Sequence, residues 1–207
     1  MNNIRLYRHP LSGHSHRVQL LLSLLGLDAK LVDVDLAAGE HKQAEFLARN
    51  RFGQVPVLED GDTVIADSNA ILVYLAEQYD ASKTWLPVDP VAAAEVQRFL
   101  SAAAGQIAYG PAAARLVNVF GAALDHKRAI EIAHNLLGVL DAHLDGLDWL
   151  VGNKPTIADV ANYAYIAHAP EGDVSLDNYP NVLAWLRRIE ALPGFVPMQA
   201  TAVGLAA

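Results

Sequence analysis

The sequence of 207 residues contains no cysteine, which excludes disulfides, thiolate metal ligands and a cysteine nucleophile. Positive charge is also scarce, because 15 Lys and Arg stand against 23 Asp and Glu and leave a formal net charge of −8 at pH 7. An acidic chain without a basic run is a poor binder of nucleic acid. No apolar run approaches the ~20 residues of a membrane span, and the N-terminus lacks the layout of a signal peptide. We therefore expect a soluble, cytoplasmic protein that binds neither nucleic acid nor membrane.

Apolar side chains are abundant by contrast. They make up 53% of the chain, against 18% charged residues, which is enough for a packed core and excludes a disordered chain. Domains average roughly 150 residues, so this length fits one large domain or two small ones. The hydrophobic pattern changes near residue 81, which favours two domains. We expect the first domain at 1–80, a linker at 81–89 and the second domain at 90–207.

Strands and helices alternate in residues 1–80. Apolar residues at every second position predict strands, whereas apolar residues at helical spacing predict helices. The predicted strands cover 4–8, 30–35, 55–58 and 63–66, and the predicted helices include 18–25, 43–49 and a stretch that begins at 67–68. This alternation places the first domain in the α/β class.

The second domain is predicted to be helical throughout. Apolar residues recur at helical spacing in 91–104, 127–147 and 179–192, and we expect four or five helices. Thr156 and Asp159 have the spacing of a capping box, in which a hydroxyl and an acid satisfy the first N–H groups of a helix. We interpret this pair as a stabilising element rather than a catalytic one.

Three features of the first domain suit a binding site, and each also has an ordinary structural explanation. Val55-Pro56 is either a plain proline at a strand start or a bend that turns the backbone of Val55 towards an extended peptide ligand. Asp67 and Ser68 stand at a helix start, where they cap the helix or help its free N–H groups to bind a carboxylate. Ser12 is either a turn residue or a hydrogen-bond donor to an anion.

The eight histidines do not predict a metal site. His9, His14 and His16 are close in sequence, but residues i and i+2 of a helix point to different faces. No carboxylate cluster with zinc-like spacing accompanies them. His134 and His143 lie in an apolar-periodic helix, where we expect them on the surface or packed. We therefore expect no metal.

Five short segments form an ordered set along the chain. They are Pro10-Leu11-Ser12-Gly13, Phe52 to Leu58, Asp67 to Leu72, Pro155 to Asp159, and Tyr179 to Phe195. With this set the chain resembles the cytosolic glutathione S-transferase family, and most closely its bacterial members, over roughly residues 4 to 196. The resemblance implies a thioredoxin-like α/β N-terminal domain, an all-α C-terminal domain, glutathione as co-substrate and a role in detoxification.

The resemblance also implies a glutathione site in residues 1–80. Val55, with a cis peptide bond to Pro56, is expected to pair with the cysteinyl part of glutathione. Ser68 and the helix start are expected to hold the γ-glutamyl carboxylate, and Asp67 its ammonium. Ser12 matches the activating hydroxyl of serine-type members. The residues expected near the glycyl end are His41, Lys42 and Gln54.

The sequence departs from the family pattern next to Ser12. His14 stands where several bacterial relatives have asparagine, and Ser15 offers a second hydroxyl at the same helix start. The group that touches the glutathione sulfur is therefore open among Ser12, His14, Ser15 and a backbone N–H near Gly13.

The function that the resemblance implies is conjugation of glutathione to a small hydrophobic electrophile. Leu11, Gln106 and Tyr109 are expected to line the electrophile pocket, and Phe52 to insert into the partner subunit of a homodimer. Two alternatives stay open. One is a glutathione-dependent disulfide or peroxide reductase that uses no protein cysteine, and the other is a non-catalytic transferase-like binding module.

Overall fold

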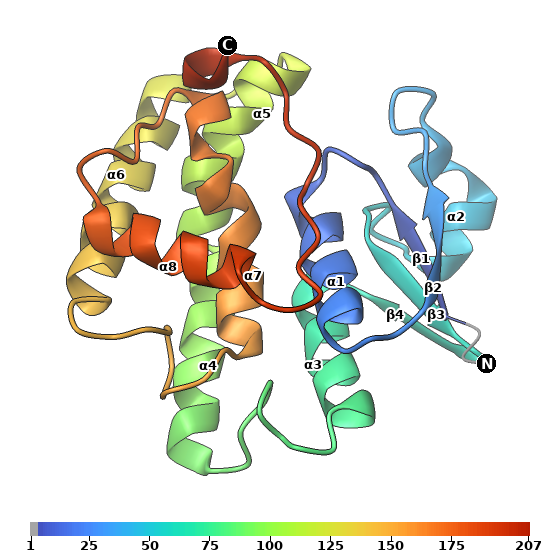
Figure 1. Ribbon diagram of the computed structural model, residues 1–207. Helices are drawn as coiled ribbons and strands as arrows, with labels where there is room; N and C mark the ends of the chain where they lie inside the picture. The colour runs from blue at the N-terminus through green and yellow to red at the C-terminus, as the bar shows by residue number, and fades with distance from the viewer. Residues whose placement is uncertain (1–3) are drawn as a thin grey trace. The chain divides into compact units, whose positions relative to one another are not determined.

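The computed structural model describes residues 4–207, which form two compact units (Figure 1). The first unit contains the chain up to Lys83 together with Pro193–Gln199, and the second contains Thr84–Leu192 together with Ala200–Ala207. Within residues 4–207, no helix combines the length and apolar character needed to cross a membrane.

The first unit is a four-stranded sheet with helices on both faces. Its elements are β1 (Ile4–Arg8), α1 (Gly13–Leu24), β2 (Ala29–Asp33), the 3₁₀ turn η1 (Glu40–Lys42), α2 (Ala44–Arg49), β3 (Val57–Asp60), β4 (Thr63–Ala66) and α3 (Ser68–Tyr79). The strand order is β2-β1-β3-β4, with β1 and β2 parallel and the other two pairs antiparallel. Helices α1 and α3 cover one face and α2 lies on the other (Figure 1). The predicted thioredoxin-like class is confirmed.

Two predicted strands are shifted by the pairing of their neighbours. The strand predicted at 55–58 is observed at Val57–Asp60, because Pro56 has no N–H to donate and β1 pairs with residues 57–60. Asp60 pairs with Thr63, so the turn between β3 and β4 contains only the two residues 61 and 62. The strand predicted at 30–35 is observed at Ala29–Asp33, because its partner β1 ends at Arg8.

The sheet buries apolar side chains on both faces. Ile4 and Leu6 of β1 are at most 2% exposed, as are four apolar residues of α1 and four of α3. On the opposite face, Val34, Phe46 and Val57 form a smaller buried cluster. This packing fixes α1 and α3 side by side on one face of the sheet.

The second unit is helical, as predicted. Its main helices are α4 (Pro90–Ala104), α5 (Ala113–Phe120), α6 (His126–His143), α7 (Ile157–Ala167) and α8 (Pro180–Glu190), with a π-helical turn, η2 (Ala108–Ala112), before α5. The helix predicted over 127–147 ends four residues early, and Gly146 just beyond it has φ +74°, which helical backbone does not adopt. Two histidines of α6 have hydrogen-bond partners within this unit. His143 Nε2 lies 2.9 Å from the Leu150 carbonyl, and His134 Nδ1 lies 2.9 Å from the Tyr179 hydroxyl.

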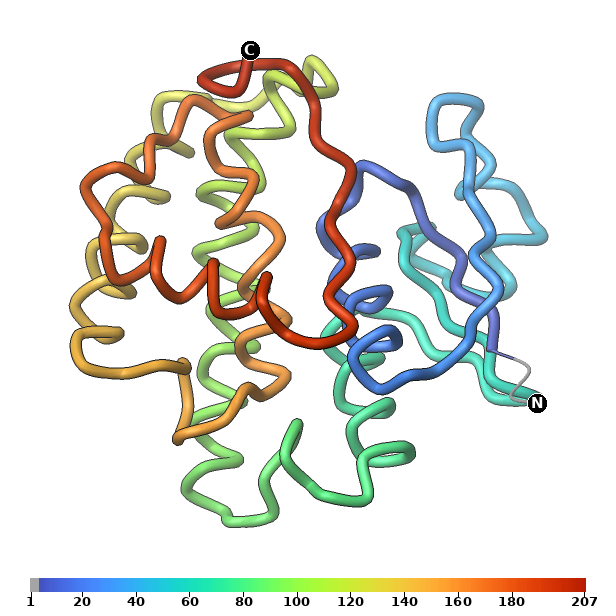
Figure 2. Tube along the Cα trace, in the orientation of Figure 1, coloured from blue at the N-terminus to red at the C-terminus, as the bar shows by residue number. Residues whose placement is uncertain are grey.

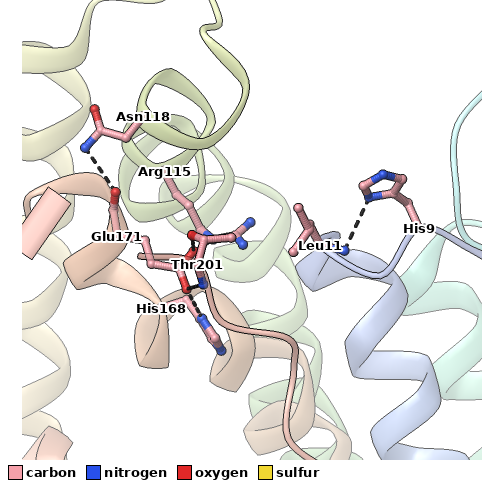
Figure 3. A network of polar contacts seen from close by, with 7 residues as sticks. All are labelled: His9, Leu11, Arg115, Asn118, His168, Glu171 and Thr201. Atoms are coloured by element: carbon pink, nitrogen blue, oxygen red, sulfur yellow. Dashed lines mark hydrogen bonds and ion pairs between the residues drawn. The ribbon is translucent and has the colours of Figure 1, made fainter. Parts of the chain in front are cut away.

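A buried carboxylate anchors the end of the chain to this unit (Figure 3). Glu171, in the 3₁₀ turn η3 (Ala169–Gly172), accepts from Arg115 Nε at 2.6 Å and from the Thr201 hydroxyl at 2.6 Å, and it lies 2.6 Å from His168 Nδ1. Burial alone would raise the pKa of Glu171, but the hydrogen bonds from Thr201 and His168 and the charge of Arg115 hold that pKa below its usual range. The segment Ala200–Ala207 therefore has a specific attachment rather than a loose end.

The preceding segment, Pro193–Gln199, runs beside α1 in the first unit (Figure 2). Ser23 Oγ donates to the Gly194 carbonyl at 2.6 Å, and His16 Nε2 lies 2.8 Å from the Val196 carbonyl. His16 is only 3% exposed, so this histidine of α1 serves packing and chain attachment.

Candidate functional site

Two helix starts meet at one edge of the sheet in the first unit. Strand β1 leads into α1, and β4 leads into α3; β1 and β4 point the same way because each is antiparallel to β3. Both helices lie on the same face, so both begin at the same edge. Their first turns are in contact, since His14 Nδ1 lies 3.3 Å from Ser68 Oγ. The N–H groups and positive dipole ends of two helices therefore favour an anion here.

Ser12 is the N-cap of α1. Its Oγ accepts from the Ser15 N–H at 3.2 Å, and its own N–H donates to the His9 carbonyl at 3.0 Å, which closes the turn. The side chain is partly exposed. Because the capping bond uses an oxygen lone pair, the hydroxyl proton of Ser12 stays available for donation.

The two neighbouring candidates for the sulfur contact are placed differently. Ser15 is 1% exposed, and its Oγ accepts from the His9 N–H at 3.3 Å, beneath the turn. His14 faces Ser68, and burial together with the charge of Arg17 lowers the pKa of His14 to about 3. The imidazole of His14 is therefore neutral at physiological pH.

Asp67 and Ser68 begin α3 in two distinct ways. Asp67 is exposed, and its Oδ1 accepts from the N–H groups of Asn69 and Ala70, both at 2.9 Å. Its φ of +76° lies in a region that residues other than glycine rarely adopt, at a cost of about 1–3 kcal/mol. Such strain is concentrated at binding and catalytic sites. Ser68 is 4% exposed, and its hydroxyl faces α1.

Val55 and Pro56 lie just before β3, outside the hydrogen-bonded sheet. The Val55–Pro56 bond is cis, as the resemblance implies. Among the hydrogen bonds of residues 4–207 that lie outside helices and strands, none uses the N–H or C=O of Val55. Asn50 Nδ2 holds the Gln54 carbonyl at 2.8 Å, while the Gln54 side chain is exposed.

Lys42 ties the η1 turn to the loop before β3. Its Nζ donates to the Gly53 carbonyl at 2.8 Å and to the Phe52 carbonyl at 3.3 Å. Gly53 has φ +57°, and a Cβ there would lie 2.8 Å from the His41 carbonyl, so this close approach requires glycine. His41 Nδ1 is buried without a hydrogen-bond partner in residues 4–207. The Phe52 side chain itself is 82% exposed.

The three residues predicted for an electrophile pocket belong to different units. Leu11 lies in the turn before α1, where its N–H donates to His9 Nδ1 at 3.3 Å (Figure 3). Gln106 is exposed at the break after α4. Tyr109 lies in the π-helical turn η2 and is 70% exposed.

Sequence reasoning missed Arg17, which is 1% exposed in α1. Its Nη1 donates to Ser68 Oγ at 3.2 Å and to Asn69 Oδ1 at 2.8 Å. An arginine at the start of the apolar stripe of a helix is a detectable signal, because buried arginine requires polar partners. The partners themselves are more than 50 positions away in the chain. Within residues 4–207, no group of three or more His, Asp or Glu side chains is placed to hold a metal ion.

Comparisons with known proteins agree with this arrangement. The family model for the glutathione S-transferase N-terminal domain matches residues 2–77, and the model for the C-terminal domain matches residues 103–193. Glutathione S-transferase 3 of Zea mays is 36% identical over 94% of this chain and 92% of its own length.

Solved structures give the same picture. A glutathione S-transferase from Pseudomonas fluorescens is 31% identical with a TM-score of 0.89, over 95% of this chain and 99% of its own. A glutathione transferase homologue from Drosophila mojavensis, solved with bound glutathione, is 30% identical with a TM-score of 0.86, over 93% of this chain and 90% of its own. Sequence, fold and the paired helix starts thus lead to one conclusion, that this chain belongs to the glutathione S-transferase family.

Proposed function

We propose that this protein activates glutathione as its thiolate and transfers it to a small hydrophobic electrophile. The observation that carries the proposal is the meeting of two helix starts, one capped by a partly exposed serine and the other by a strained, exposed aspartate. The glutathione-bound structure of the Drosophila mojavensis homologue supports glutathione as the co-substrate.

Glutathione is a peptide with charged ends, and the site offers partners along its length. Ser68 and the positive dipole end of α3 suit the γ-glutamyl carboxylate, while Asp67 suits its ammonium. The unpaired backbone of Val55 suits the cysteinyl amide groups. Lys42, His41 and Gln54 are assigned to the glycyl end, with Lys42 exchanging part of its contact to Phe52 and Gly53 for the carboxylate.

The chemistry follows from the thiol. A free thiol has a pKa of about 8.5, and the thiolate is the nucleophile. A hydroxyl donor from Ser12 and the start of α1 stabilise the charged form, which lowers the thiol pKa. A shift of about 2 units corresponds to roughly 2.7 kcal/mol. The thiol proton leaves to solvent, and the sulfur then forms a bond to the electrophilic carbon as the bond from that carbon to its leaving group breaks, which releases chloride in the case of chloro-dinitrobenzene.

We also propose that the protein is a two-fold homodimer in which Phe52 is buried by the partner subunit. The ring is 82% exposed, yet its backbone is held by Lys42 and by Asn50, whose Oδ1 accepts from the Phe52 N–H at 3.1 Å. A rigid loop that presents an aromatic ring is suited to insertion into a partner. We expect light scattering to show a dimer that Phe52→Ala weakens; a tight dimer in that variant excludes this role for Phe52.

Three parallel assays test the proposed reaction. We expect turnover of chloro-dinitrobenzene with glutathione, little reduction of hydroxyethyl disulfide, and glutathione binding by calorimetry. Disulfide reduction that exceeds conjugation would identify a reductase instead. Binding with neither activity would identify a transferase-like binding module.

A further inference from the structure

The hydroxyl of Ser68 lies between two side chains of α1. Arg17 Nη1 is 3.2 Å from Ser68 Oγ, and His14 Nδ1 is 3.3 Å from the same oxygen. A serine hydroxyl has one proton to donate and two lone pairs that accept. The two side chains of α1 therefore decide where the proton of Ser68 points.

Arg17 and His14 act on this hydroxyl in different ways. Arg17 has only donors, so it always occupies a lone pair of Ser68 Oγ. Neutral histidine has two tautomers. With its proton on Nε2, His14 accepts the Ser68 proton at Nδ1. With its proton on Nδ1, His14 donates to Ser68 Oγ and leaves the Ser68 proton free to point elsewhere.

We propose that His14 is a positioning residue for Ser68, and that glutathione binding selects the tautomer of His14 that carries its proton on Nδ1. In that state Ser68 Oγ accepts from both Arg17 and His14 and donates its single proton to the γ-glutamyl carboxylate. This inference rests on the proposed glutathione site and extends it by assigning a role to a residue that departs from the family pattern.

The electrostatics of the site agree with this role. Burial and the charge of Arg17 hold His14 neutral, so the ring chooses between two neutral tautomers rather than between a neutral and a charged state. The proton moves from Nε2 to Nδ1 by exchange with solvent, and no net proton is taken up. The site keeps the positive charge of Arg17 for the carboxylate.

A matched pair of variants tests the role. Asparagine and leucine are close in shape, but only asparagine retains an N–H donor at position 14. We expect His14→Asn to keep glutathione affinity within about threefold and His14→Leu to weaken it about tenfold, the effect of one hydrogen bond. The kcat and the pKa of bound glutathione, followed by thiolate absorbance, should change in neither variant.

A double-mutant cycle then asks whether His14 acts through Ser68. In a Ser68→Ala background we expect His14→Leu to cause no further loss of glutathione affinity, because the group it orients is gone. Additive losses would show that His14 acts independently and would overturn the inference. A shifted thiolate pKa in His14→Leu would instead place His14 at the sulfur and also overturn it.

The wild-type protein gives a readout that does not depend on folding of the variants. The ¹⁵N NMR shifts of the His14 ring report its tautomer, and we expect an Nδ1–H ring in the complex with glutathione. An Nε2–H ring in that complex overturns the inference while leaving the proposed function standing. If Ser68→Ala alone leaves glutathione affinity unchanged, the error lies in the proposed placement of the γ-glutamyl group.

Discussion

The starts of α7 and α3 each have a hydroxyl and an acid side chain, but they differ in burial, in backbone conformation and in hydrogen-bond partners. At the start of α7, Thr156 and Asp159 are 3% and 1% exposed. At the start of α3, Asp67 is exposed with φ +76°, and Ser68 is buried against α1. The first has the features of a stability element and the second those of a binding site.

At the start of α7, the side chains of Thr156 and Asp159 are engaged in hydrogen bonds within the protein. Asp159 Oδ2 accepts from the Thr156 N–H at 2.8 Å, and Asp159 Oδ1 accepts from the Leu150 N–H and from Trp185 Nε1, both at 2.9 Å. The Thr156 hydroxyl caps the Ala158 N–H at 3.2 Å. Burial raises the pKa of Asp159 while these donors oppose the rise. A carboxylate with this many internal donors holds the fold together.

The largest effect on stability is expected at Asp159. Replacing Asp159 by Ala leaves several buried donors without an acceptor, so we expect a loss of about 3–5 kcal/mol in the free energy of unfolding. The measurement is urea denaturation followed by circular dichroism. Glutathione affinity of the folded fraction should not change.

A matched control is Asp125, the N-cap of α6, which accepts from the Arg128 N–H at 3.0 Å on the surface. Asp125→Ala should cost only about 1 kcal/mol, the ordinary value of a cap. Equal losses for the two variants would show that the buried network around Asp159 adds nothing beyond capping.

The next effect concerns Ser12, the cap that we assign to the thiolate. Ser12→Ala removes one hydrogen bond to a charged sulfur, worth about 1.5–3 kcal/mol, so conjugation should slow roughly ten- to hundredfold. Glutathione affinity should stay nearly unchanged, while the pKa of bound glutathione rises. The measurement is thiolate absorbance against pH. A shift in Ser15→Ala but not in Ser12→Ala would move the role to Ser15.

Ser68 is expected to affect binding rather than the rate. Ser68→Ala should weaken glutathione binding by about 1–3 kcal/mol, because the γ-glutamyl carboxylate loses a hydrogen bond far from the sulfur. Calorimetric titration measures this loss, and single-turnover rates at saturating glutathione should be preserved. A slower single-turnover rate with intact affinity would contradict the assignment.

The smallest effect on stability is expected at Asp67. Glycine adopts φ +76° without strain and is a tolerable N-cap, so Asp67→Gly should leave the free energy of unfolding within about 1 kcal/mol of the wild type. Glutathione affinity should nevertheless fall, because the partner of the ammonium is lost. A large loss of stability with unchanged affinity would make the α3 start a structural cap like that of α7.

Much of this comparison is visible in the sequence because capping is local. Thr156 and Asp159 are three positions apart, and their capping box is confirmed. The α3 start follows in the same way from Asp67 before an apolar helical pattern. The partners that distinguish the two starts are remote, however. Trp185 is 26 positions from Asp159, and His14 is 54 positions from Ser68.

The errors in element bounds also arise from non-local contacts. The strand expected at 55–58 begins at Val57 because it must pair with β1, and no pattern within the segment reveals that register. The helix expected to reach 147 stops at His143, where a turn containing Gly146 leads to the chain around Leu150. His143 then bonds the Leu150 carbonyl, a contact that the helical spacing did not reveal.

The α/β and all-α halves and the capped helix starts follow from the sequence, because periodicity and capping act over a few residues. The absence of any protein thiol follows from composition, which needs no fold. That the α1 and α3 starts share one edge follows from the tertiary fold. That outcome depends on β1 and β4 both running antiparallel to β3, with both helices on one face. The same packing buries Arg17 and sets His14 against Ser68, since a long-range hydrogen bond forms only when the core has placed its two partners.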